Sequence, residues 1–202
     1  MISNSGNVAL ISWGIPAHSQ WQLCYSLASH GSSSYTFHSN CDNKGHTVTV
    51  AQLSTGKAVG GCTSQSWAGS SYASDSEAFL FSLSGSHKYS VGRQGSSGGY
   101  QAIYGSSSNL PTFGAGFDLK LASGPYCNLG YSYACRVGSY GSSTCRNDFC
   151  GAPNGFSVQK LEVFFAVTTT TTSMTTTSTI IPSTLFESTT VVNRARDLSS
   201  WQ

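Results

Sequence analysis

A predicted β-hairpin in the first third of the chain constrains the fold more than any other feature. Residues 46–53 (HTVTVAQL) alternate in character, and residues 57–63 (KAVGGCT) follow after the short stretch Ser54-Thr55-Gly56. Alternation with a period of two is typical of a strand with one buried face, and glycine supplies the positive φ that a three-residue hairpin loop needs. The sequence therefore predicts two antiparallel strands here.

Further apolar runs extend this pattern along the chain. Residues 78–83 (AFLFSL) are typical of a buried strand, and residues 117–121 and 157–167 are two more candidates. In the last of these, four side chains share one face: Leu161, Val163, Phe165 and Val167. Loops rich in glycine and serine separate the runs, so we expect a mainly β fold, an antiparallel β-sandwich flanked by one or a few short helices.

One helix is predicted near the N-terminus. Ser19 and Gln22 fit a capping box, in which each side chain bonds the other residue's backbone N–H. Apolar side chains then follow at helical spacing, and Gly31 stands where a left-handed C-cap would end the helix: Trp21, Cys24, Tyr25 and Ala28.

The composition changes sharply after Val167, which divides the chain into two parts. Residues 1–167 carry the patterns above, whereas residues 168–202 begin with a low-complexity threonine tract. Such a tract cannot bury enough apolar surface to offset its ordering entropy, so we expect a disordered tail. The tail is either an O-glycosylated stalk or a plain spacer.

Charge and hydropathy exclude several classes of partner. Only 9% of the residues are charged and the formal net charge is +2, which is too weak to attract nucleic acid or anionic lipid. No run approaches the ~20 apolar residues of a membrane span, so we expect no direct membrane insertion. The first residues lack a basic group before their apolar stretch and make a poor secretory signal. We therefore expect a cytoplasmic location; an extracellular one would require a segment upstream of Met1.

No motif for catalysis, cofactor binding or metal binding is found. The chain has no G-x-S-x-G nucleophile elbow and no phosphate-binding G-K-[ST] run, and we expect neither an enzyme nor a cofactor. Four late cysteines lack the short C-x2-C clips of structural zinc sites and are instead candidates for one or two disulfides in an oxidising compartment: Cys127, Cys135, Cys145 and Cys150. With 7 cysteines, at least one is free or intermolecular.

Several sequence blocks, taken in order, resemble the TLDc domain. The specific ones are residues 37–47 (FHSNCDNKGHT), residues 56–64 (GKAVGGCTS) with Trp67 after them, and residues 74–83 (SDSEAFLFSL). The likeness continues more loosely through residues 113–119 and 128–133 to residues 161–163, and so covers nearly all of residues 1–167. Two features depart from it: Cys62 stands where an aromatic residue is usual, and the late cysteines surround a loop that is poor in cysteine in typical members.

The resemblance implies a β-sandwich with flanking helices and a non-enzymatic role. TLDc proteins are linked to protection against oxidative stress, and several bind the vacuolar-type proton-pumping ATPase, which makes that pump the candidate partner. No established active site comes with the family, so no catalytic residue is carried over. The signature and candidate interaction residues are His38, Cys41, Asp42, Lys44, Gly45, Gly60, Gly61, Trp67, Asp75, Phe79 and Phe81.

Most of these residues have a structural interpretation. Gly60 and Gly61 predict a close backbone approach or a bulge within a strand. Asp42 suits a tight turn in which its side chain bonds the backbone ahead of it. Phe79 and Phe81 are expected on one face of a centrally placed strand that is buried on both faces. His38 and Lys44 either hydrogen-bond to the turn or make an exposed contact, and we favour the hydrogen bonds.

Three functions are compatible with the sequence. The first is a TLDc interaction domain in stress protection or in regulation of the proton pump. The second is an extracellular recognition module of the same fold, cross-linked by disulfides and carried on the threonine-rich stalk. The third is a thiol-based scavenger in which His38 and Lys44 lower the pKa of Cys41. The alternative for Cys41 is a small buried apolar residue.

Overall fold

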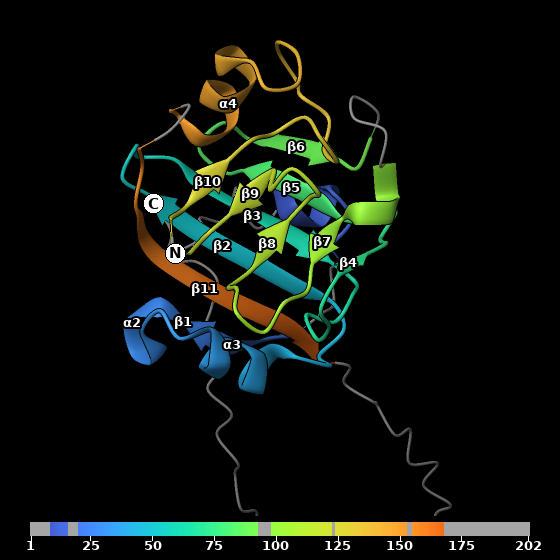
Figure 1. The fold of residues 1–202 in the computed structure, drawn as a ribbon, viewed down its shortest axis with the longest axis vertical. Coiled ribbons are helices and arrows are strands. Elements are labelled where there is room, and N and C mark those ends of the chain that lie inside the picture. Colours follow the sequence, from blue (N-terminus) through green and yellow to red (C-terminus); the bar gives the residue numbers. More distant parts are fainter. Residues whose placement is uncertain (1–8, 16–19, 93–97, 123, 153–154, 168–202) are drawn as a thin grey trace, which may run out of the picture.

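The chain folds into two antiparallel β-sheets packed face to face, as expected (Figure 1). The computed structural model describes residues 9–15, 20–92, 98–122, 124–152 and 155–167. Sheet A has the order β1 (Gln20–Ser26), β11 (Val158–Val167), β2 (Thr47–Leu53), β3 (Ala58–Thr63), β5 (Phe79–Ser82) and β6 (His87–Ser90). Sheet B has the order β10 (Tyr126–Cys127), β9 (Leu119–Lys120), β8 (Thr112–Phe113), β7 (Ile103–Tyr104) and β4 (Tyr72–Ala73).

Short helices lie at the margins of the sandwich. α2 (Leu27–His30) and α3 (Ser34–Cys41) follow β1, α4 (Ser143–Cys150) precedes β11, and the 3-10 helix η1 (Gly98–Gln101) precedes β7. Each longer helix begins at a serine cap: the Ser33 hydroxyl accepts from Thr36 N–H at 3.2 Å, and the Ser142 hydroxyl accepts from Cys145 N–H at 3.2 Å. Within the described ranges, no helix is long and apolar enough to cross a membrane.

The predicted hairpin is confirmed as β2 and β3. Its register runs from Thr47 opposite Thr63 to Gln52 opposite Ala58, and Gly56 has φ 82° in the connecting turn. The strands expected at residues 78–83 and 157–167 are also confirmed, as β5 and β11. The strand expected at residues 117–121 is shorter, because only Leu119–Lys120 pair.

The helix predicted over residues 19–31 is wrong for most of its length. Residues 20–26 form β1, and a register shift between Leu23 and Tyr25 marks a bulge at Cys24. The bulge brings Cys24 and Tyr25 into the same core. Two consecutive buried side chains are also typical of a helix, which is why the sequence pattern predicted one. Only Leu27–His30 is helical, and Gly31 ends it with φ 62°. Ser19, the predicted cap, lies outside the described residues.

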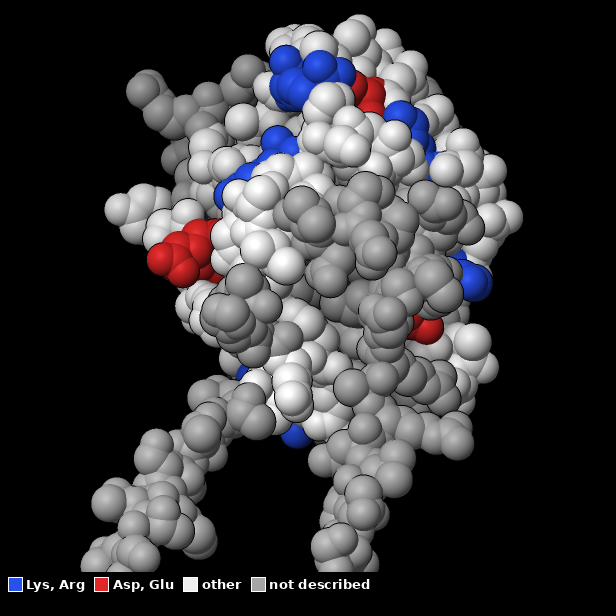
Figure 2. All heavy atoms as spheres, turned by 180° about the vertical axis from the view of Figure 1, so that it is seen from behind, with Lys and Arg blue, Asp and Glu red and all other residues white. Residues whose placement is uncertain are grey.

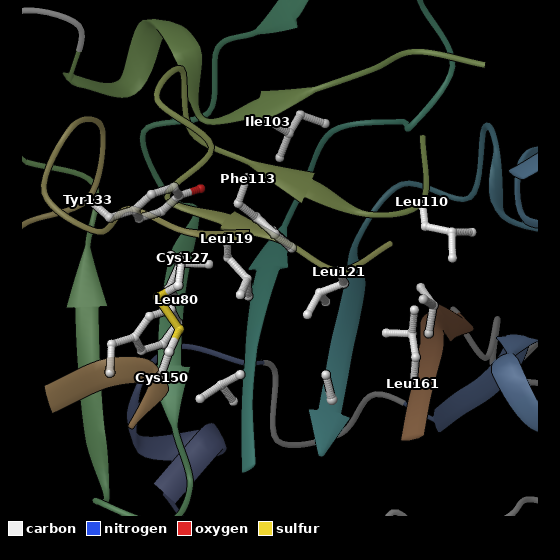
Figure 3. Close-up of a cluster of buried hydrophobic side chains, with 14 of the residues drawn as sticks. Leu80, Ile103, Leu110, Phe113, Leu119, Leu121, Cys127, Tyr133, Cys150 and Leu161 are labelled. Atoms are coloured by element: carbon white, nitrogen blue, oxygen red, sulfur yellow. A yellow bond between two sulfur atoms is a disulfide. The ribbon is translucent and has the colours of Figure 1, made fainter. Parts of the chain in front are cut away.

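The main core lies between the two sheets (Figure 3). Sheet A contributes side chains such as Leu80 and Leu161, and sheet B faces them with Phe113 and Leu119. Three of the four side chains predicted to share a face of β11 contact this core, namely Leu161, Val163 and Phe165, whereas Val167 is half-buried outside it. Tyr133 is fully buried in this core and its hydroxyl donates to the Ala102 carbonyl at 2.7 Å, so its polar group is satisfied.

A second, smaller core covers the outer face of sheet A. Phe79 and Phe81 point there together, as predicted, beneath Leu10 and Ile15 from the N-terminal segment. The Trp13 ring centroid lies 6.4 Å from that of Phe81. β5 is buried on both faces but lies between β3 and the edge strand β6, so it is less central than expected. β11 ends at Val167, and the predicted disordered tail, residues 168–202, lies outside the described residues.

Candidate functional site

The signature block around His38 forms the end of α3 and the turn after it. The His38 Nδ1 atom lies 2.8 Å from the Asp42 carboxylate, and its Nε2–H donates to the Ser106 carbonyl at 2.8 Å and the Asn109 carbonyl at 3.1 Å. His38 therefore fastens α3 to the loop that precedes β8. Asp42 was expected to bond the backbone ahead of it, but its carboxylate instead orients the imidazole of His38.

The rest of this turn is also structural in character. Asn43 and Gly45 both have positive φ, 58° and 72°, which is the backbone that such residues tolerate in a tight turn. The Lys44 ammonium is exposed and lies 4.9 Å from the centroid of the Phe165 ring. Lys44 therefore makes a cation–π contact with β11, rather than the hydrogen bond to the turn that we favoured.

Cys41 carries no thiol in this structure. It is bonded to Cys24 with a Cα–Cα distance of 5.4 Å, and it is fully buried. The low-pKa thiolate that the scavenger hypothesis requires at this position is therefore absent. Cys62 is the free cysteine, and burial, together with the nearby Asp75 carboxylate, raises the pKa of its thiol to about 12. A thiol in this state is a poor nucleophile.

The two adjacent glycines of β3 admit an aromatic ring from each side of sheet A. A Cβ on Gly60 would lie 2.5 Å from the Phe81 ring, and a Cβ on Gly61 would lie 2.6 Å from the Phe113 ring. β3 pairs with both neighbours without a register shift, so close approach is the correct alternative and the bulge is not. Gly60 and Gly61 therefore serve packing on both faces.

Asp75 joins the end of β3 to the start of β5. Its Oδ2 accepts from the Thr63 hydroxyl at 2.7 Å and from Ser64 N–H at 2.6 Å, and its Oδ1 accepts from Glu77 N–H at 3.1 Å. Nearby, the buried Trp67 donates its indole N–H to the Thr47 hydroxyl at 3.0 Å. Through these bonds, the signature residues Asp75 and Trp67 both stabilise the fold.

A surface hollow of about 530 Å³ opens beside Asp75. Seven residues line it: Ser64, Gln65, Ser74, Asp75, Ser76, Glu77 and Tyr100. The lining holds carboxylates, hydroxyls and one aromatic ring, but it has neither a histidine nor a cysteine for acid–base or nucleophilic chemistry. Among the described residues, no group of three or more His, Cys, Asp or Glu side chains is placed to hold a metal ion.

The late cysteines form two nested disulfides. Cys127 is bonded to Cys150 and Cys135 to Cys145, so the inner bond closes a loop within the outer one. Gly151 ends α4 in the left-handed conformation with φ 77°. These bonds hold α4 and its preceding loop against β10, in a segment with little regular structure of its own.

Asp118 is a heavily hydrogen-bonded side chain that the sequence patterns did not single out as a site residue. It is fully buried, and its carboxylate accepts four backbone N–H groups from the loop after β10: those of Gly130, Tyr131, Ser132 and Tyr133, at 2.8 to 3.4 Å. Burial raises the pKa of Asp118 to about 6, although these four bonds act in the opposite direction. An aspartate inside the apolar run FDLKL is the signal that could have pointed to it.

The signature residues thus divide among separate places and do not converge on one catalytic centre. In the comparison with known families, the TLDc domain family matches the chain over residues 1–166. No curated protein matches the chain. The match spans the whole described sandwich up to the last residues of β11, and the chain therefore belongs to the TLDc domain family.

Proposed function

We propose that this chain is a non-enzymatic, protein-binding TLDc domain that works in an oxidising compartment and is stabilised by three disulfides. One observation carries the proposal: six of the 7 cysteines pair within the chain, as Cys24–Cys41, Cys127–Cys150 and Cys135–Cys145. Disulfides persist in oxidising compartments and are rare in the cytosol, where thiols are kept reduced. This favours the extracellular recognition module over the cytoplasmic location expected from the N-terminus.

The positions of the disulfides support this function. Cys24–Cys41 ties edge strand β1 to α3, and the nested pair closes the segment that contains α4. The first bond thus joins an edge strand to a short helix, and the nested pair lies in a segment with little regular structure, so each cross-link stabilises the fold by constraining the unfolded chain. A cytosolic copy would lose all three links and keep its peripheral segments only by weaker contacts.

The chemistry of the polar residues supports a binding role rather than catalysis. His38, Asp75 and Asp118 are each engaged in hydrogen bonds that fasten one segment of the fold to another. Surface charge is sparse: on the described part of the face in Figure 2, basic and acidic side chains form small separate groups among uncharged ones. Recognition through shape and uncharged side chains fits such a surface better than long-range electrostatic attraction.

A thiol count in the native source tests the compartment. Cells that make the protein are treated with an alkylating agent, and the protein is then unfolded under the same agent without reduction. We expect one alkylated cysteine, Cys62, and seven after reduction. Seven alkylated cysteines without reduction would contradict the proposal and would support a cytoplasmic location instead.

The role in oxidative-stress protection or at the vacuolar-type proton pump is a second proposal, and it is favoured by the family match over residues 1–166. It requires that the chain meet the cytosolic sector of the pump. Purified full chain, in oxidised and reduced forms, is mixed with that purified sector and analysed by size-exclusion chromatography. Co-elution of the reduced form at constant stoichiometry would support the pump role, whereas separate elution of both forms would exclude it.

A further inference from the structure

The outward positions of sheet B carry tyrosine where a solvent-facing sheet normally carries polar side chains. Strand alternation sends Tyr72, Tyr104 and Tyr126 outward with Lys120, while their strand neighbours enter the core: Ala73, Ile103, Cys127 and Leu119. Antiparallel sheets with one face on the core usually show polar residues on the other. The outer face of sheet B departs from this rule on three of its five strands.

These side chains are extended by neighbours into a continuous aromatic row. Ring centroids lie 4.8 Å apart for Tyr72 and Tyr104 and 5.9 Å apart for Tyr104 and Phe117. Tyr131 packs against the backbone of Gly116, directly beside Phe117, and its ring centroid lies 5.5 Å from that of Tyr140. We call this set the aromatic row: Tyr72, Tyr104, Phe117, Tyr131 and Tyr140.

The fold holds the row rigidly. Phe117 has φ 54°, an uncommon conformation for a bulky residue, which persists only where the surroundings impose it and which clusters at binding sites. The next residue, Asp118, binds the backbone N–H of Tyr131 at 2.9 Å. The Tyr72 hydroxyl donates to the Ala115 carbonyl at 2.9 Å. A surface fixed in this way loses little conformational freedom when a partner binds.

The described part of the chain covers the row only in part. In Figure 1 sheet B faces the viewer, and the labelled helices lie at the ends and sides of the sandwich. The outer face of sheet A differs, because residues 9–15 cover it with Leu10 and Ile15. Four side chains of the row are half-buried, and Tyr140 is 44% exposed.

The charges at the row are cationic. The Lys120 ammonium lies 5.5 Å from the centroid of the Phe117 ring. At the other end, the Arg146 guanidinium donates to the Asn128 amide oxygen at 2.8 Å, and the amide nitrogen of Asn128 is 3.5 Å from the Tyr140 hydroxyl. The nearby carboxylate of Asp118 is fully buried and does not offset these charges at the surface.

We propose that the aromatic row is a docking surface for a segment of a protein partner that carries carboxylate side chains beside aliphatic or aromatic ones. Tyrosine is enriched among the residues that dominate binding energy in protein interfaces, and Lys120 supplies a charge complementary to an acidic segment. The proposal rests on the function proposed above and names the surface and the chemistry of the partner.

Three labelled synthetic peptides of equal length test the chemistry of the occupant. One alternates Glu and Leu around a central Phe, one has Lys in place of Glu, and one has Ser in place of Leu and Phe. Fluorescence anisotropy measures their affinity for the oxidised full chain. We expect the first peptide to bind most tightly. Equal affinity for all three peptides, or no binding of the first, would overturn the proposal.

Substitutions then locate the binding surface. Tyr104→Thr keeps a strand-forming residue and should weaken binding of the first peptide at least about thirtyfold, the loss typical of a dominant interface residue. Lys120→Glu should weaken it as well and strengthen binding of the Lys peptide. Tyr35→Thr, at a tyrosine 81% exposed on α3, and Lys57→Glu are the matched controls and should change neither affinity.

Phe117→Gly separates binding from folding. Glycine adopts φ 54° freely, so the variant should keep the thermal midpoint of the parent chain while it loses the ring and weakens binding. Unchanged affinity in Phe117→Gly and Tyr104→Thr would overturn the proposal. So would concentration-dependent self-association that the same variants abolish, because a second copy of the chain would then occupy the row. Either failure leaves the count of alkylated cysteines unaffected, so it is distinguishable from a failure of the proposed function.

Discussion

Cys24 in β1 and Cys41 at the end of α3 are joined by a disulfide across 17 residues of chain. A closed loop of this length contributes about 3 kcal/mol to folding by constraining the unfolded chain. We therefore predict that replacing both residues by serine lowers the free energy of unfolding by about that amount. Urea denaturation under oxidising conditions measures the difference. An unchanged midpoint would show that the bond does not form or does not constrain the unfolded state.

Gly60→Ala should be strongly destabilising. The new Cβ would lie 2.0 Å from the Thr49 carbonyl oxygen and 2.5 Å from the Phe81 ring, and the backbone oxygen cannot move aside without disturbing β2. We expect a loss above about 3 kcal/mol, the upper end of overpacking costs. Gly92→Ala is the control, because its Cβ would meet its nearest neighbour at 3.5 Å and should be neutral. Equal unfolding midpoints for the two variants would contradict this packing.

Phe81→Ala tests the core on the outer face of sheet A. The side chain is fully buried in the cluster that includes Val50 and Phe164, so its removal should cost about 3–5 kcal/mol through lost burial and a residual cavity. Chemical denaturation gives the value. A normal midpoint would mean that Phe81 lies on an accessible surface, which would contradict the described position of residues 9–15.

The Asp118 carboxylate predicts a specific pH dependence. Its pKa is raised from 3.8 to about 6 in the folded chain, so between these values the folded state binds more protons than the unfolded state. The free energy of unfolding therefore falls as the pH rises through this window, by an amount on the order of 3 kcal/mol. We predict that the stability of the parent chain relative to Asp118→Asn decreases from pH 3.5 to pH 7. A relative stability that increases over that range would show that the four N–H donors outweigh burial.

The strands with strong patterns could be predicted from the sequence, and the bulged one could not. Alternation identified β2 and the shared apolar face identified β11, and the short loop that ends at Gly56 then indicated β3 as the partner of β2. The prediction of a helix in place of β1 was wrong because the bulge at Cys24 places two consecutive side chains in one core. A sequence pattern cannot distinguish this arrangement from a helical turn. Gly60 and Gly61 predicted either a close approach or a bulge, but the two rings that decide for the close approach come from β5 and β8.

Apart from residues 117–121, which predicted a strand around β9, sheet B and the aromatic row had no sequence signal of comparable strength. Each strand of this sheet contains two residues, which is too short for any period to be recognised. Its tyrosines lie far apart in the chain and become neighbours only through pairing. Disulfide connectivity is a similar case, since four cysteines allow three pairings and spacing does not select among them.

Disulfide mapping of the native protein tests the central claim most directly. The protein is alkylated, digested without reduction and analysed by mass spectrometry. We predict linked peptides for Cys24–Cys41, Cys127–Cys150 and Cys135–Cys145, with Cys62 as the alkylated residue once the chain is unfolded. Alkylated thiols at all seven positions, or linked peptides in other combinations, would contradict a disulfide-stapled domain of an oxidising compartment.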